Sequence, residues 1–167
     1  NLPDRSFAVF QEYQSLFLIS PDIHSYNALL AACAAQRKLN ISAIFSIFQE
    51  IETCPEDISA NEESFTILLH AMCVCRSFDI FEQVIEHMLS HNVLAARHAL
   101  TNAAVALARS GEHWREVELV KQLLIAQRVG LPPSALSPLS SLQETLDRAY
   151  KADTRRNKSI LYAPPSS

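Results

Sequence analysis

The sequence predicts an all-α fold in which antiparallel helical hairpins stack into a right-handed α-α superhelix, or solenoid. The first observation is a short pattern of one apolar, two polar and one apolar residue, whose four copies end 38, 37 and 35 residues apart. The copies are Phe10-Gln11-Glu12-Tyr13, Phe48-Gln49-Glu50-Ile51, Ile85-Glu86-His87-Met88 and Val120-Lys121-Gln122-Leu123. A period of this length is typical of arrays of helix pairs, which offer a long surface to another polymer.

A second pattern keeps the same period. The copies are His24-Ser25-Tyr26-Asn27-Ala28-Leu29-Leu30, Glu63-Ser64-Phe65-Thr66-Ile67-Leu68-Leu69 and, more loosely, His98-Ala99-Leu100-Thr101-Asn102-Ala103-Ala104. Their third positions, Tyr26, Phe65 and Leu100, lie 39 and then 35 residues apart. Two patterns in each period predict two helices in each repeat.

Composition narrows the class of protein further. The chain has 167 residues, of which 49% are hydrophobic and 19% charged, and this suits one folded domain. Only Gly111 and Gly130 are glycines, so the Gly-rich loops that cradle phosphates in nucleotide-binding enzymes are excluded. No apolar run reaches 18 residues, and we expect no membrane partner.

Three hairpins follow a single helix over residues 5–17, which ends before Pro21-Asp22. Their predicted helices cover residues 24–35 with 41–52, 62–75 with 79–91, and 97–110 with 113–128. Each shows apolar residues at 3–4 spacing, which is typical of a helix with one buried face. Either Asp22 or Ser25 can cap the helix over 24–35, and Gly111 can adopt the positive φ that ends the helix over 97–110.

The organisation that results has three parts. Residues 1–133 hold three repeats with a preceding helix, residues 134–156 hold a capping helix with a basic end, predicted over 138–151, and residues 157–167 form an extended or disordered tail. Residues 147–158 carry a net charge of +3, so the remainder carries −7 of the total of −4. The basic residues there are Arg148, Lys151, Arg155, Arg156 and Lys158. They are either a solvated helix end or a contact for phosphate.

With these residues in view, the chain resembles the pentatricopeptide repeat family. The opening Pro21-Asp22 followed by Tyr26-Asn27-Ala28-Leu29-Leu30 is similar to the opening of that family's repeat, and Phe48-Gln49-Glu50-Ile51 is similar to its second helix. The resemblance covers residues 5–133 and is best in the first repeat. It implies a non-catalytic protein of mitochondria, or alternatively of plastids, that works with RNA.

The resemblance also implies base-reading positions, two in each repeat. They are Asn27 with Asn61, Thr66 with Ala96, and Thr101 with Pro132. The positions that would clamp the base hold His24, Glu63 and His98, and Glu63 repels phosphate. We therefore expect RNA to be contacted through its backbone rather than read base by base, by a scaffold subunit of a large ribonucleoprotein such as the mitochondrial ribosome. Its other partners would be neighbouring proteins. The alternative is a freestanding single-stranded RNA-binding protein in transcript processing, stability or translation.

Residues that could carry chemistry are sparse. The four cysteines are typical of buried thiols in a reducing compartment rather than of a disulfide framework. His70 and Cys73 on one predicted helix, with His87 and His91 on the next, could in principle bind zinc, but their spacing matches no known zinc motif. We therefore expect no metal, no cofactor and no catalysis. We expect Trp114 to pack between the helices of the third repeat, with a place on a partner surface as the alternative.

Overall fold

The computed structural model describes residues 8–9, 12, 21–36, 39–53 and 58–136 of the chain. These residues form α2 (Ile23–Ala34), α3 (Ile41–Thr53), α4 (Glu62–Cys75), α5 (Phe81–Ser90), α6 (Arg97–Ser110), α7 (Trp114–Val129) and a 3₁₀ helix, η1 (Pro133–Leu136). They contain no strand, which confirms the all-α class. The predicted helix over 138–151, the tail and most of the predicted helix over 5–17 lie outside the described residues.

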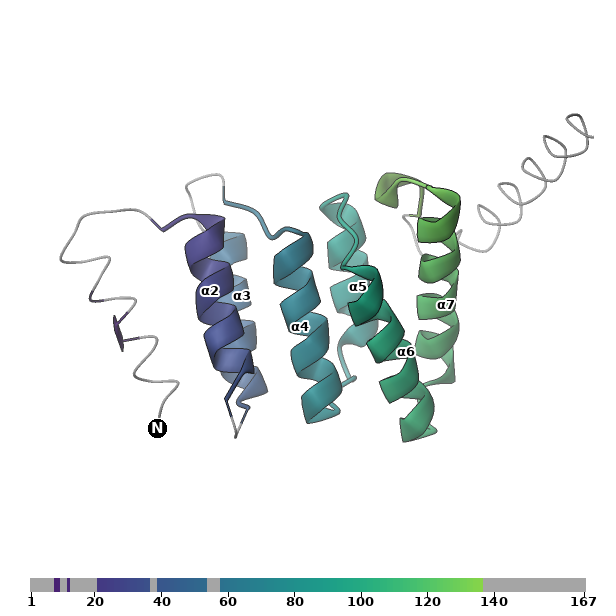
Figure 1. Cartoon of the computed structure of the whole chain (residues 1–167), viewed down its shortest axis with the longest axis horizontal. Coiled ribbons are helices and arrows are strands. Elements are labelled where there is room, and N and C mark those ends of the chain that lie inside the picture. The colour runs from purple at the N-terminus through teal and green to yellow at the C-terminus, as the bar shows by residue number, and fades with distance from the viewer. Residues whose placement is uncertain (1–7, 10–11, 13–20, 37–38, 54–57, 137–167) are drawn as a thin grey trace, which may run out of the picture.

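The helices lie in two rows (Figure 1). Helices α2, α4 and α6 stand side by side, and α3 and α5 lie behind them. Helix α2 packs on α3 and α4, α4 packs on α3 and α6, and α6 packs on α7, while α5 contacts η1. From α2 to α6, consecutive helices therefore alternate between the two rows, and one face of the front row is left uncovered by other described helices.

Side-chain caps set the first residues of two front-row helices. The Asp22 carboxylate accepts a hydrogen bond from the Ser25 amide at 2.8 Å and another from the Ser25 hydroxyl at 2.7 Å. These bonds hold the pKa of Asp22 below its usual range because they favour the charged carboxylate. Helix α4 begins with a reciprocal box, in which the side chains of Asn61 and Ser64 each accept a bond from the other residue's amide. Of the two caps that the sequence allowed for α2, Asp22 is the one used.

Residues with positive φ, in the left-handed backbone conformation, follow the ends of several helices. Gly111 has a φ of 77° at the end of α6, as predicted, and Gly130 has a φ of 76° at the end of α7. An added Cβ would meet nothing within 4 Å at either glycine, so the positive φ rather than crowding favours glycine there. Arg76 and Asn92 adopt the same conformation after α4 and α5.

One hydrophobic core runs through both rows. It includes Ile44 and Phe48 of α3, Phe65 of α4 and Ile85 of α5, all buried. The rings of Phe48 and Phe65 meet edge to face with centroids 5.2 Å apart, which joins α3 to the next front-row helix. Helices of the two rows are therefore held together by shared apolar contact.

Two expectations from the sequence need correction. Helix α5 begins at Phe81, two residues later than predicted, because Phe78 and Phe81 pack against each other and the Phe81 amide donates to the Phe78 carbonyl in a preceding turn. Trp114 is 68% exposed rather than buried. It is the first residue of α7 and precedes the stripe, starting at Val117, that this helix buries.

The lengths and apolar character of the described helices bear on whether any of them could span a membrane. None of them combines the length and the apolar character that crossing a lipid bilayer demands.

Candidate binding groove

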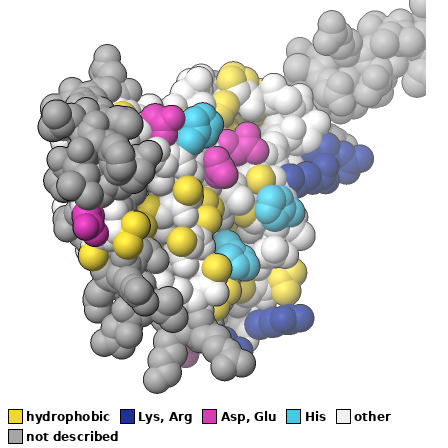
Figure 2. Space-filling view, turned by 60° about the vertical axis from the view of Figure 1, so that its left-hand side comes forward, with side chains coloured by type: hydrophobic (Ala, Val, Ile, Leu, Met, Phe, Trp, Pro, Cys, Tyr) yellow, Lys and Arg dark blue, Asp and Glu magenta, His cyan; other side chains and the backbone are white. Residues whose placement is uncertain are grey.

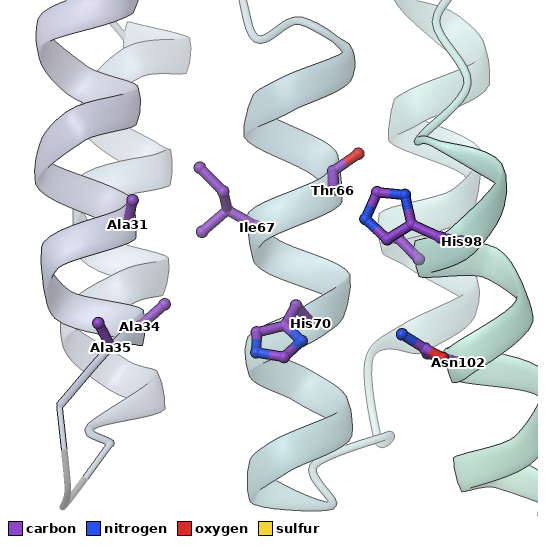
Figure 3. Close-up of a pocket in the computed structure, with 9 residues that line it drawn as sticks. Ala31, Ala34, Ala35, Thr66, Ile67, His70, His98 and Asn102 are labelled. Atoms are coloured by element: carbon purple, nitrogen blue, oxygen red, sulfur yellow. The ribbon is translucent and has the colours of Figure 1, made fainter.

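A groove of about 260 Å³ crosses the front row of helices. It is lined by Ala31, Ala34, Ala35, Thr66, Ile67, His70, His98, Ala99 and Asn102. Three alanines come from α2 and its last turn, whereas α4 and α6 supply the larger side chains (Figure 3). The groove exists because α2 carries small side chains where the neighbouring helices carry large ones.

The lining combines apolar and hydrogen-bonding groups. Figure 3 shows Ile67 projecting from α4 toward the alanines of α2, while His98 and Asn102 project from α6 toward α4. None of the lining residues is Asp, Glu, Lys, Arg, Ser or Cys. The groove therefore offers an apolar floor with imidazole, amide and hydroxyl groups at its side, which suits binding.

Charged groups lie outside the groove lining. Figure 2 shows a face on which apolar side chains are interleaved with histidine and acidic side chains, while Lys and Arg side chains lie at its edge. The acidic groups of the front row include Glu62 and Glu63 in the first turn of α4. Such a face does not attract a polyanion through its overall field.

Asn27, the first predicted base-reading residue, is only 1% exposed. Its Nδ2 donates to Asn61 Oδ1 and to Glu63 Oε2, both at 3.1 Å. Its Oδ1 accepts a bond of 2.6 Å from the Ser64 hydroxyl. The Asn27 amide is thus committed to joining α2 to the start of α4, and a base could reach it only by displacing these bonds.

The other predicted reading residues lie in different settings. Thr66 is half-buried, and its hydroxyl accepts a 2.9 Å bond from the amide of Ala96, its predicted partner. Thr101 is exposed and donates to the Arg97 carbonyl at 2.8 Å. Two of the three predicted pairs, the one of Asn27 and the one of Thr66, are therefore in direct contact. The basic residues Arg148, Lys151, Arg155, Arg156 and Lys158 lie outside the described part of the chain.

A second group of polar side chains lies in the rear row. Glu52 Oε2 is 2.7 Å from His87 Nε2 and 2.9 Å from His91 Nε2. The predicted grouping of these histidines with His70 and Cys73 is wrong. His70 lines the front groove, and Cys73 lines a small cavity between α4 and α6. Glu52 was missed because it lies 35 and 39 residues before its two partners, His87 and His91. The one signal for it in the sequence is that both separations are close to the period of the repeated patterns.

Comparisons of the chain with protein-family models, with curated proteins and with solved structures give no match.

Proposed function

We propose that this protein is a non-catalytic, pentatricopeptide-like helical-repeat scaffold that belongs to an organellar ribonucleoprotein, such as the mitochondrial ribosome. The observation that carries the proposal is the groove across α2, α4 and α6, whose lining holds no Asp, Glu, Lys or Arg side chain. A neighbouring protein segment placed across the three helices would bury the alanine floor and use the imidazole and amide groups for orientation.

The spacing of contacts supports the repeat architecture. Hydrogen bonds join residues about one repeat apart at several places along the array. They link Asn27 to Asn61 over 34 residues, Glu52 to His87 over 35, Cys75 to the Leu39 carbonyl over 36 and Gln127 to the Ala95 carbonyl over 32. Contacts at separations of 32 to 36 residues are consistent with a stack of helix pairs, since each repeat would then touch its neighbour about one period away.

Charge and burial favour a scaffold over a base reader. The Asn27 amide is buried and already bonded, and the Glu63 carboxylate lies 3.1 Å from it. A carboxylate at this position would repel a phosphate backbone. We therefore assign RNA contact to the basic segment over residues 147–158. The organellar location is inferred from the resemblance to the pentatricopeptide repeat family.

Sedimentation of cell extracts tests the scaffold role. The tagged chain is expected to co-sediment with a large particle from the mitochondrial fraction and to move to light fractions after RNase treatment. Ala31→Glu places a charge in the groove and should lower the share of chain in the particle several-fold. Ala32→Glu is the matched control, because Ala32 is exposed on the same helix but does not line the groove. A chain that stays in light fractions before RNase treatment overturns the proposal.

The alternative, a freestanding single-stranded RNA-binding protein, is favoured by the direct contact within the pairs Asn27–Asn61 and Thr66–Ala96. Fluorescence anisotropy with single-stranded RNA at ~0.05 and ~0.15 M salt separates the two, because phosphate contacts weaken steeply with salt. Binding tighter than micromolar at the higher salt, lost in Asn27→Ala but kept in Gln83→Ala, would support the reader, because Gln83 is exposed on α5 and does not line the groove. Absence of binding at the higher salt supports the scaffold.

A further inference from the structure

The rear row brings three metal-binding side chains to one point. Glu52 lies in the last turn of α3, His87 lies in the last turn of α5, and His91 caps the end of α5. Their possible ligand atoms all lie within 4.8 Å of one another, and the centroids of the two imidazole rings are 4.6 Å apart. Residues four apart share a helix face, so α5 presents both imidazoles to the same side.

Aromatic packing holds the imidazoles in place. The Phe65 ring centroid is 6.2 Å from those of both His87 and His91, and the Phe48 centroid is 6.0 Å from that of His87. Phe48 and Phe65 are themselves core residues. The two Nε2 atoms are therefore directed at Glu52 by a packed apolar base, which reduces the conformational entropy lost when a ligand binds there.

Only one of the two Glu52 carboxylate oxygens has a hydrogen-bond partner among the described residues. Both histidines contact Oε2, whereas Oε1 is buried and lacks a hydrogen-bond partner among the described residues. A buried oxygen without a partner costs free energy, and such atoms in proteins often mark a bound ion or water. This oxygen points to a ligand independently of the two histidines.

We propose that Glu52, His87 and His91 form a binding site for a divalent transition-metal ion, with Zn²⁺ as the preferred ion. Two imidazole nitrogens with one carboxylate are a common zinc ligand set, and imidazole disfavours Ca²⁺ and Mg²⁺. Ligand atoms around tetrahedral zinc are about 3.3 Å apart, given bonds of about 2.0 Å. Small side-chain rotations from the present 2.7 and 2.9 Å contacts would admit the ion.

The proposed ion would act as a cross-link between neighbouring hairpins. Glu52 belongs to the hairpin of α2 and α3, and both histidines belong to the hairpin of α4 and α5. The site lies in the rear row and shares no residue with the groove. A fourth position is left for water or for a side chain from a partner. The inference is therefore independent of what the groove binds.

Titration of the full chain with Zn²⁺, followed by calorimetry and thermal unfolding, tests the site. We expect one ion per chain and a raised midpoint of unfolding, because an ion that binds the folded state stabilises it. His87→Ala, His91→Ala and Glu52→Gln should each weaken Zn²⁺ binding by at least ~100-fold, which is the upper end of the loss seen when only an outer-shell group is removed. His70→Ala and His98→Ala are the matched controls, since both residues are exposed in the groove.

Co²⁺ keeps the test informative if a variant folds poorly. Tetrahedral Co²⁺ should give intense visible absorption bands with the natural chain, and His91→Cys should add a thiolate-to-metal band while retaining binding. Equal Zn²⁺ affinity in the natural chain and in Glu52→Gln would overturn the three-ligand site. So would equal losses in His70→Ala and His87→Ala, or an absence of bound Zn²⁺ in the natural chain.

Discussion

Replacing Asn27 with alanine should destabilise the protein, because the Asn27 amide joins two neighbouring front-row helices. The amide makes bonds of 3.1 Å to Asn61, 3.1 Å to Glu63 and 2.6 Å to Ser64. Asn27 is 1% exposed and Ser64 is fully buried, so water does not replace these bonds freely.

The size of the expected loss in unfolding free energy depends on whether each hydrogen-bond partner of Asn27 finds another partner. A typical intramolecular hydrogen bond contributes about 1 kcal/mol net. The Ser64 hydroxyl keeps a 3.1 Å contact to Asn61 Oδ1, and the exposed Glu63 carboxylate can turn to water, so neither is left as a buried unpaired group. We therefore expect the free energy of unfolding to fall by about 2–3 kcal/mol, which corresponds to a drop of about 4–12 °C in the midpoint for a chain of this size.

Denaturant unfolding followed by circular dichroism measures this loss. The matched control is Asn102→Ala, which removes an exposed amide from α6 and should change stability by less than about 0.5 kcal/mol. A double-mutant cycle with Ser64→Ala should give a coupling energy of about 1 kcal/mol between the two residues. If Asn27→Ala costs no more than Asn102→Ala, the buried network contributes nothing and the reasoning from burial fails.

Three further outcomes are expected. Phe65→Ala should lower the free energy of unfolding by about 3–5 kcal/mol, because the ring is fully buried against Phe48; a loss below about 1 kcal/mol in denaturant unfolding would contradict this packing. Trp114→Ala should change it by no more than about 0.5 kcal/mol, since the indole is 68% exposed, and a large loss in the same assay would place the indole in the core. Burial raises the pKa of Cys73 from 9.0 to about 11, which makes the thiolate at pH 8 about 100-fold scarcer than in the unfolded chain. Alkylation of Cys73, followed by mass spectrometry, should accordingly be much slower in the folded protein than in guanidinium, and equal rates would contradict the burial.

Local signals made most helix boundaries predictable. The predicted bounds of α2, α3, α4, α6 and α7 agree with the structure to within one residue. Caps and apolar stripes depend on residues three or four apart, such as Asp22 with Ser25, and the sequence displays these directly. Helix α5 was placed two residues too early because no side chain caps it, and packing between Phe78 and Phe81 sets its start.

The sequence by itself determined the all-α class, the bounds of most helices and the left-handed turn at Gly111, because each rests on backbone sterics and on hydrogen bonds within one turn. Only the tertiary structure decided that Asn27 is buried among α4 side chains, that Trp114 is exposed and that Glu52 meets His87 and His91. These outcomes depend on how each helix is rotated and shifted against a neighbour about one repeat away. Periodicity gives the order of the helices but not their mutual rotation, and an error of one residue in helix phase turns a side chain by about 100°.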